Sequence, residues 1–228
     1  MDQEPLKLVI FDVDGTLLDS RSAILAAMAL ACDRAGLARL PDADVLGIVG
    51  LSLPETMQVL FPHLGRPDQI RMVEFYRAGF LELRQSGAGE AETPMFEGAR
   101  EILRELDGAG YLLSIATGKA RRGLNHMIES HGLEGMFIGA QTADDAPSKP
   151  HPQMVLNCME ATGVAPENTV LVGDTEFDIA MARAAGCHAV GVSWGYHSHE
   201  RMMRAEPHRI IERFEHLPPV LDQLWSGR

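Results

Sequence analysis

The chain has 228 residues, of which 46% are hydrophobic and 23% are charged, a composition typical of a folded protein with one large domain or two unequal ones. Its 32 acidic residues outnumber its 20 basic residues, and the resulting formal charge of −12 disfavours non-specific binding to nucleic acid or to anionic lipid. An anionic substrate would therefore have to be attracted by cations that are local to its site.

The cysteines and the beginning of the chain argue against a secreted or membrane-bound protein. Cys32, Cys158 and Cys187 are odd in number, far apart and without CxxC spacing, so we expect buried thiols and neither a disulfide framework nor a zinc site. Residues 1–5 lack the features of a signal peptide, and no later segment is long and apolar enough to cross a bilayer. We expect a cytoplasmic protein without a nucleic-acid or membrane partner.

Short apolar runs alternate with longer segments of helical periodicity, which predicts an α/β fold with a Rossmann-like parallel sheet and flanking helices. The expected strands are 7–11, 111–116, 136–140, 169–172 and 188–192, with 209–211 as a weaker edge strand. The expected helices of this core are 98–107, 120–130, 152–162 and 177–185.

One long segment departs from this alternation. Residues 21–86 show helical periodicity and no convincing strand, which predicts an inserted, all-helical subdomain. Residues 17–19 lead into it, and the small residues 87–89 with Thr93 and Pro94 lead out, as in a hinge. We therefore expect a core domain of residues 1–18 and 92–228 and a helical domain of residues 19–91.

The first candidate for chemistry follows the first strand. Asp12 and Asp14 lie two residues apart where this apolar strand ends, and ligands bind at such carboxyl ends of parallel sheets. A plain polar turn is the alternative. A calcium loop would also begin Asp-x-Asp-Gly, but Leu17 and Leu18 replace the oxygen ligands expected at later positions.

The second candidate, Thr117-Gly118-Lys119, follows the second expected strand. The Thr117 hydroxyl and the Gly118 backbone could hold a phosphate oxygen, although for this segment alone a threonine that caps the next helix is favoured. It does not match a nucleotide P-loop, because the upstream glycine is absent and Ala120 replaces Ser or Thr.

The last two candidates are a lysine and a second acidic pair. Lys149 precedes Pro150 and Pro152, which restrict the backbone and would aim its ammonium group, although most lysines are simply solvated. Asp174 follows the strand 169–172, and Asp178 comes four residues later, near a helix start. Capping of that helix and a role at the site are equally good explanations of these two residues alone.

The four segments become more informative together, because each lies at the carboxyl end of an expected strand or in a loop beside one. Four crowded carboxylates, those of Asp12, Asp14, Asp174 and Asp178, cannot all stay ionised beside a phosphate without a neutralising cation. Carboxylate and phosphate oxygens suit Mg²⁺ better than zinc. The sequence therefore predicts a magnesium site, with Lys149 opposite.

In this order, the four segments resemble the four signature motifs of the haloacid dehalogenase superfamily. The resemblance covers essentially the whole chain, including a helical cap inserted after the first motif and the stretch 191–197. It is most similar to the phosphoglycolate phosphatase-like branch. This resemblance implies that Asp12 is the nucleophile and that Asp14 protonates the leaving oxygen and later activates water. It also implies that Thr117, Gly118 and Lys149 hold the transferring phosphoryl group.

The resemblance also implies a set of metal ligands. Asp12, the backbone carbonyl of Asp14, and Asp174 would bind Mg²⁺, and Asp178 would support them directly or by orienting Lys149.

The implied activity is a magnesium-dependent phosphatase that hydrolyses a small-metabolite phosphate monoester through an aspartyl-phosphate, with 2-phosphoglycolate as the leading substrate. A sugar-phosphate mutase similar to β-phosphoglucomutase is the main alternative, followed by specificity for a nucleotide or pyrophosphate. Dehalogenase and phosphonate-cleaving activities are disfavoured, because Asp14 is present and residues 21–86 contain no lysine. A non-catalytic binding protein is disfavoured by the intact motifs. The oligomeric state is left open.

Substrate recognition is less well defined in the sequence. Residues 47–52 resemble the cap loop that faces the site, with Ser52 as its one polar side chain. Arginines in the cap could neutralise an anion, but their spacing is typical of a solvated helix face; they are Arg66, Arg71, Arg77 and Arg84. Near the end of the chain we expect surface histidines rather than a metal site, at His188, His197, His199 and His208. Trp194 and Tyr196 are expected to pack near the end of the sheet.

Overall fold

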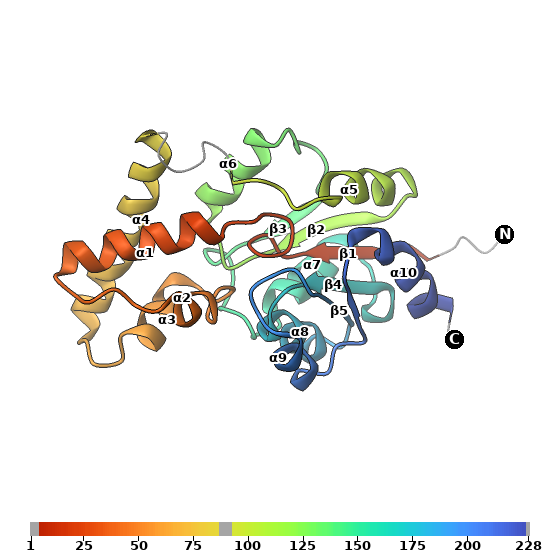
Figure 1. The fold of residues 1–228 in the computed structure, drawn as a ribbon. Helices are drawn as coiled ribbons and strands as arrows, with labels where there is room; N and C mark the ends of the chain where they lie inside the picture. Colours follow the sequence, from red (N-terminus) through yellow and green to blue (C-terminus); the bar gives the residue numbers. More distant parts are fainter. Residues whose placement is uncertain (1–4, 87–92, 227–228) are drawn as a thin grey trace.

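The computed structural model describes residues 5–86 and 93–226. Its core is a six-stranded, all-parallel sheet with the strand order β3-β2-β1-β4-β5-β6 (Figure 1). The strands are β1 (Leu8–Phe11), β2 (Leu112–Ala116), β3 (Gly139–Gln141), β4 (Thr169–Gly173), β5 (His188–Val192) and β6 (Arg209–Ile211). The predicted Rossmann-like fold class is confirmed.

The third strand begins three residues later than expected. Met136 donates its backbone N–H to Leu133 in a turn, and the first backbone bond to β2 is made by Ile138. Met136 and Phe137 pack against the core from this turn. Their apolar character therefore reflects burial rather than strand pairing.

Helices cover both faces of the sheet, and β1 shows why. Its four residues are completely buried, as in a central parallel strand, and they alternate between two hydrophobic clusters. Val9 and Phe11 pack with α5 (Ala99–Gly108), α6 (Arg121–Ser130) and α10 (Leu217–Ser226). Leu8 and Ile10 pack with α7 (Gln153–Thr162) and α8 (Glu176–Ala184) on the other face. The remaining short helices are η1 (Pro166–Asn168), α9 (His199–Arg204) and η2 (Phe214–His216), and Phe214 of η2 packs with Val9 and Phe11 in the first cluster.

A separate group of helices lies beside the sheet, at the left of Figure 1. It consists of α1 (Arg21–Ala35), α2 (Asp42–Leu46), α3 (Leu53–Leu60) and α4 (Arg66–Ser86), and no strand occurs between residues 21 and 86. These helices enclose a third hydrophobic cluster, which includes Met28, Met57 and Phe61.

The segments that enter and leave this helical group lie side by side. Leu18 forms an antiparallel bridge with Met95, and the backbone N–H of Asp19 donates to Pro94 at 2.9 Å. The segment 87–89, which we expected to belong to the exit hinge, lies outside the described residues.

The three cysteines are buried and unpaired, as expected. Burial raises the pKa of Cys158 and of Cys187 to about 12. Within residues 5–86 and 93–226, no helix combines the length and apolarity needed to cross a membrane.

Candidate active site

Asp12 lies at the carboxyl end of the central strand. Its backbone N–H donates to the Val172 carbonyl at 3.0 Å and extends the pairing of β1 with β4, which fixes the residue where the carboxyl ends of the strands meet. The carboxylate is buried; Oδ1 is paired with Lys149, and Oδ2 accepts no hydrogen bond from a described residue. Burial raises the pKa of Asp12 from its ordinary 3.8 to about 7, against an opposing effect from Lys149. Asp12 is therefore a buried carboxylate whose Oδ2 is left without a described partner.

Lys149 supplies the positive charge beside Asp12. Its Nζ lies 2.8 Å from Oδ1 of Asp12 and donates a 2.6 Å hydrogen bond to Oδ1 of Asp178. Burial alone would lower the pKa of Lys149, but attraction to the two carboxylates raises it above its ordinary value. The ammonium group is therefore charged although its side chain is inaccessible to solvent.

Asp178 orients this lysine. Its second oxygen, Oδ2, accepts hydrogen bonds from the backbone N–H of Thr175 at 3.1 Å and from the Thr175 hydroxyl at 2.6 Å. Thr175 and Asp178 form the capping box at the start of α8, so the helix-capping explanation holds for Asp178. Because its other oxygen, Oδ1, bonds Lys149, the same carboxylate caps a helix and positions the ammonium group.

Asp174 faces Asp12 from the end of β4 and is held by two donors. The Thr16 hydroxyl donates to Oδ1 at 3.1 Å, and the Tyr196 backbone N–H donates to Oδ2 at 2.8 Å. Burial, together with repulsion from Asp178 and Asp12, raises the pKa of Asp174 well above 3.8. Asp174 precedes the capping residue of α8, so capping does not account for it.

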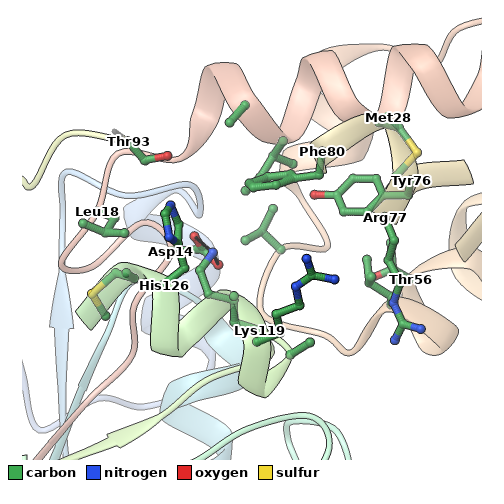
Figure 2. Close-up of a pocket in the computed structure, with 18 of the residues that line it drawn as sticks. Asp14, Leu18, Met28, Thr56, Tyr76, Arg77, Phe80, Thr93, Lys119 and His126 are labelled. Atoms are coloured by element: carbon green, nitrogen blue, oxygen red, sulfur yellow. Dashed lines mark hydrogen bonds and ion pairs between the residues drawn. The ribbon is translucent and has the colours of Figure 1, made fainter. Parts of the chain in front are cut away.

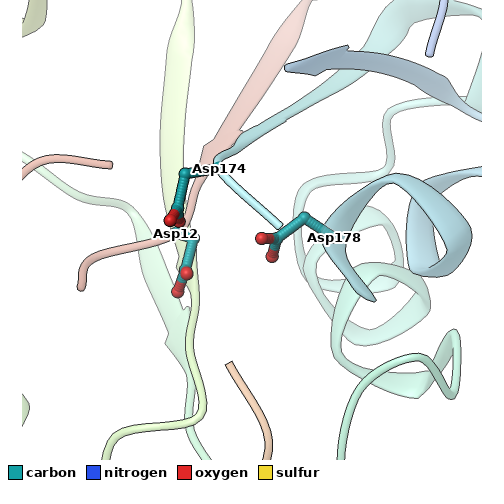
Figure 3. A group of neighbouring side chains, drawn as sticks. All are labelled: Asp12, Asp174 and Asp178. Carbon is teal, nitrogen blue, oxygen red and sulfur yellow. The ribbon is translucent and has the colours of Figure 1, made fainter. Parts of the chain in front are cut away.

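The carboxylates of Asp12, Asp174 and Asp178 offer oxygens that lie within 4.8 Å of one another (Figure 3). The pKa values of Asp12 and Asp174 are raised first by burial and further by repulsion from neighbouring carboxylates, against the opposing effect of Lys149. The oxygen-only ligands and the unpartnered Oδ2 of Asp12 fit a hard divalent cation such as Mg²⁺.

Two glycines make room for Asp174. A Cβ atom on Gly15 would lie 2.2 Å from its Oδ2, and a Cβ on Gly195 would lie 2.1 Å from its Cβ. Any larger residue at either position would displace this carboxylate. The sequence 191–197 therefore contributes to the site through its backbone.

The Asp14 side chain points away from this cluster. It accepts hydrogen bonds from Nζ of Lys119 at 2.7 and 2.8 Å, one to each oxygen (Figure 2). It also accepts a hydrogen bond from the Ser20 hydroxyl. In this arrangement only the backbone carbonyl of Asp14 is a candidate metal ligand. Its side chain faces the cap.

Thr117 and Gly118 lie at the end of β2. The Thr117 N–H donates to Gln141 at 3.0 Å, and its hydroxyl accepts from the backbone N–H of Lys119 at 3.2 Å. Because the N-cap of α6 is Ala120, the helix-capping explanation favoured for Thr117 is wrong. A Cβ on Gly118 would lie 2.5 Å from the carbonyl oxygen of Gly50, so the cap loop packs directly on this motif.

The fold and this geometry agree with a match to a known family model. The model described as haloacid dehalogenase-like hydrolase matches residues 9–192, most of the chain. The chain belongs to the haloacid dehalogenase-like hydrolases.

Individual members of the haloacid dehalogenase-like hydrolases match over nearly the full length. A probable phosphatase IndB of Dickeya dadantii is 35% identical over 91% of this chain and 90% of its own. A phosphoglycolate phosphatase of Vibrio vulnificus is 29% identical over 97% and 98%. The crystal structure of a hydrolase from Pseudomonas syringae shares the fold, with a TM-score of 0.83 at 24% identity over 95% and 98% of the two chains. The predictions of the superfamily and of a phosphoric monoester hydrolase are confirmed.

A cavity of about 540 Å³ adjoins Asp14 in this haloacid dehalogenase-like hydrolase. Its walls come from α1, α4 and α6, so it lies between the helical group and the core (Figure 2). Most of its lining is apolar, including Met28 and Phe80. Arg77 and Arg84 line it as well, whereas Arg71 forms an ion pair with Asp68 on the surface of α4. Of the four cap arginines considered as candidates, Arg77 and Arg84 are thus placed to meet a ligand.

The expectation of a surface histidine is wrong for His197. This residue is 3% exposed; its Nδ1 accepts from the Glu176 N–H at 3.1 Å, and its Nε2 lies 3.0 Å from the Gly47 carbonyl oxygen. The tautomer that satisfies both contacts carries its proton on Nε2. Arg201 also donates to Gly47, at 3.0 Å, and pairs with Glu176. Through these contacts, His197 and Arg201 connect Gly47 of the cap loop with Glu176 at the start of α8.

Sequence reasoning included Lys119 in the second candidate segment but gave it no role at the site. Its position two residues after Thr117, at the end of a strand beside β1, was the available signal. The other predicted residues meet at one edge of the sheet, and Trp194 and Tyr196 pack there as expected. Trp194 donates its Nε1 to the Thr16 carbonyl at 3.1 Å, and the Tyr196 hydroxyl accepts from the Ser20 N–H.

Proposed function

We propose that the protein is a magnesium-dependent phosphatase that hydrolyses small-metabolite phosphate monoesters through an aspartyl-phosphate on Asp12. One observation carries this proposal: the buried Asp12 carboxylate is paired through Oδ1 with the ammonium group of Lys149 at 2.8 Å, while its Oδ2 has no described hydrogen-bond donor. A carboxylate held in this way is available to attack phosphorus beside a fixed positive charge.

The two chemical steps use the two carboxylates of the first motif. An Asp12 oxygen bonds to phosphorus while the bond from phosphorus to the leaving oxygen breaks, and Asp14 gives that oxygen its proton. Water then attacks phosphorus, Asp14 takes a proton from the water, and the Asp12–phosphorus bond breaks to release inorganic phosphate. Asp14 therefore acts first as an acid and then as a base.

Other residues of the core hold the phosphoryl group and the metal. Lys149, the Thr117 hydroxyl and the Gly118 backbone N–H would contact the phosphoryl oxygens. Asp12, Asp174 and the Asp14 carbonyl would bind Mg²⁺, and Asp178 would support them through Lys149. When bound, Mg²⁺ supplies positive charge for the phosphoryl oxygens.

We assign residues 19–91 to a cap over the core of residues 1–18 and 92–228. Two contacts support a cap that closes on the site: the Ser52 N–H donates to the Ser148 hydroxyl at 2.8 Å, and Gly118 packs against Gly50. Closure would exclude water from the phosphoryl group and bring the cavity over Asp14.

The leading substrate is 2-phosphoglycolate, supported by the sequence resemblance and by relatives that carry the name phosphoglycolate phosphatase. Nucleotides and pyrophosphate are secondary candidates. The mutase alternative is weakened by the absence of lysine from residues 21–86. A cytoplasmic location stays a prediction.

The test is magnesium-dependent release of inorganic phosphate, first from an aryl phosphate and then from a panel of metabolite esters. We expect activity that EDTA abolishes, that excess Mg²⁺ restores and that Asp12→Asn removes. Equal activity without a divalent cation would refute the metal assignment. Conversion of one hexose phosphate into another, without phosphate release from any ester, would establish the mutase instead.

A further inference from the structure

We propose that Lys119 determines substrate specificity by binding a negative charge that the leaving group carries next to the scissile ester oxygen. This inference rests on the proposed phosphatase function and narrows its substrates to phosphate esters of acidic alcohols. Phosphoanhydrides such as pyrophosphate meet the same requirement, because their leaving group is itself an anionic phosphate.

The position of Lys119 relative to Asp14 is the first argument. Its Nζ lies 2.7 and 2.8 Å from the two oxygens of Asp14, the residue assigned to protonate the leaving oxygen. A leaving oxygen that is hydrogen-bonded to Asp14 is therefore at most about two hydrogen-bond lengths, roughly 6 Å, from the ammonium group, which is within reach of a charged group next to that oxygen. No other described lysine lies near the cavity, since Lys7 packs on Tyr111 and Trp225 and Lys149 is buried between Asp12 and Asp178.

The surroundings of Lys119 are the second argument. Its side chain is 17% exposed, and its Nζ lies 5.9 Å from the centre of the Phe80 ring in the cap. The ammonium group thus occupies the boundary between Asp14 and a largely apolar cavity (Figure 2). An ion pair with a ligand is stronger at such a partly desolvated site than at an exposed one.

The charge of the cavity lining is the third argument. Four basic side chains, those of Lys119, Arg77, Arg84 and Arg122, outnumber its two acidic ones, those of Asp14 and Asp144. The whole chain has the opposite balance, with a formal charge of −12. A positive lining in an acidic protein matches a ligand whose negative charge extends beyond the phosphoryl group itself.

The hydrogen bonds of Asp14 link this recognition to turnover. Both of its oxygens accept from Lys119, and the Ser20 hydroxyl adds a second bond to one of them. An anion on the leaving group would attract the ammonium group and free an Asp14 oxygen for the leaving oxygen. A neutral leaving group of the same shape would leave both Asp14 oxygens hydrogen-bonded to Lys119.

The experiment compares 2-phosphoglycolate with the phosphate ester of glycolamide, which has nearly the same shape without the carboxylate charge. For the wild-type enzyme with Mg²⁺, we expect kcat/KM for the acid to exceed that for the amide by about 10- to 100-fold. Lys119→Met should bring this ratio close to one, and Lys119→Arg should retain most of it. Arg71→Met, which removes a surface arginine outside the cavity, should keep the wild-type ratio.

A pyrophosphate arm distinguishes the two sources of the neighbouring charge, because its leaving group is itself a phosphate. If Lys119→Met loses the preference for both 2-phosphoglycolate and pyrophosphate over the glycolamide ester, Lys119 recognises the negative charge of the leaving group. If that variant does not fold, as judged by circular dichroism, Lys119→Gln takes its place. A wild-type ratio near one overturns the inference without any variant.

An unchanged ratio in a folded Lys119→Met or Lys119→Gln enzyme would also overturn the inference, because another group would then bind the charge. In both cases magnesium-dependent hydrolysis would still support the proposed function. Failure of the wild-type enzyme to hydrolyse either ester, pyrophosphate or an aryl phosphate would refute the proposed function, and this inference with it.

Discussion

The ammonium group of Lys149 lies 2.8 Å from the nearer carboxylate oxygen of Asp12, and both side chains are almost completely buried. Because the same Nζ donates to Asp178, one positive charge is shared by two carboxylates. Removing one partner of such a buried pair leaves uncompensated charge in a region of low dielectric constant. This contact therefore couples the stability of the core to the proposed chemistry.

Replacing Lys149 tests that coupling. Lys149→Met should lower the free energy of unfolding in urea at pH 8 by roughly 3–5 kcal/mol and reduce kcat by about 10²-fold or more. The loss of stability should be smaller at pH 5, where the carboxylates can be protonated. Arg71→Met should stay within about 0.5 kcal/mol of wild type. A Lys149→Met protein as stable and active as wild type would refute the assignment.

The raised pKa of Asp12 predicts a pH dependence of stability in the metal-free protein. Its pKa is about 7 in the folded protein against an ordinary value of 3.8, so the folded state holds the proton more tightly than the unfolded state. This contribution to stability is fully present below about pH 4 and is lost as the pH rises through 7. Asp174 acts in the same direction.

Thermal or urea unfolding in EDTA measures this dependence directly. Stability should fall between pH 4 and 7, and added Mg²⁺ should stabilise the protein more at pH 8 than at pH 5. Asp12→Asn should flatten the metal-free profile, because the amide does not titrate. A metal-free stability that rises steadily from pH 4 to 7 in the wild-type protein, with no change in Asp12→Asn, would contradict the account.

Gly195→Ala tests the space that the backbone reserves for Asp174. The new Cβ would lie 2.1 Å from the Asp174 Cβ and 2.4 Å from its Oδ2, so the carboxylate must move. We expect Mg²⁺ affinity, measured by titration calorimetry, to fall about 10- to 100-fold. Gly108→Ala is the matched control, since nothing lies within 4 Å of its added Cβ. Unchanged affinity in Gly195→Ala would remove Asp174 from the metal site.

Gly118→Ala tests the contact between the cap loop and the core. The added Cβ would lie 2.5 Å from the Gly50 carbonyl oxygen and 2.9 Å from that of Leu51, which would push the loop away from the site. We expect kcat/KM to fall by about 10²-fold, with little change in the urea midpoint. Gly108→Ala again serves as the control. Full activity in Gly118→Ala would show that this close approach is not needed for turnover.

Much of the core site followed from the sequence, because parallel strands bring their carboxyl ends to one edge. Asp12, Thr117 and Asp174 each follow an apolar run that could be recognised locally. The loop contacts could not be predicted in this way. Lys119 meets Asp14 across 105 positions, and His197 meets the cap loop across 150, so neither contact leaves a local pattern.

The last helix was missed for a different reason. α10 contains Pro218 and Pro219, which argue against a helix when they are read as interior residues. Both lie in its first turn, where the missing N–H groups would have had no partner within the helix. Its apolar residues Leu217, Leu221 and Trp225 then follow the spacing of one buried face.

The central claim is that Asp12 becomes phosphorylated during turnover. The most direct measurement mixes Asp14→Asn enzyme and Mg²⁺ with an aryl phosphate, whose leaving group needs no protonation, stops the reaction in acid and maps phosphorylated peptides by mass spectrometry. Because Asp14 also activates water, the variant should accumulate one phosphoryl group on Asp12. A phosphoryl group on any other residue, or continued phosphate release by Asp12→Asn enzyme, would contradict the mechanism.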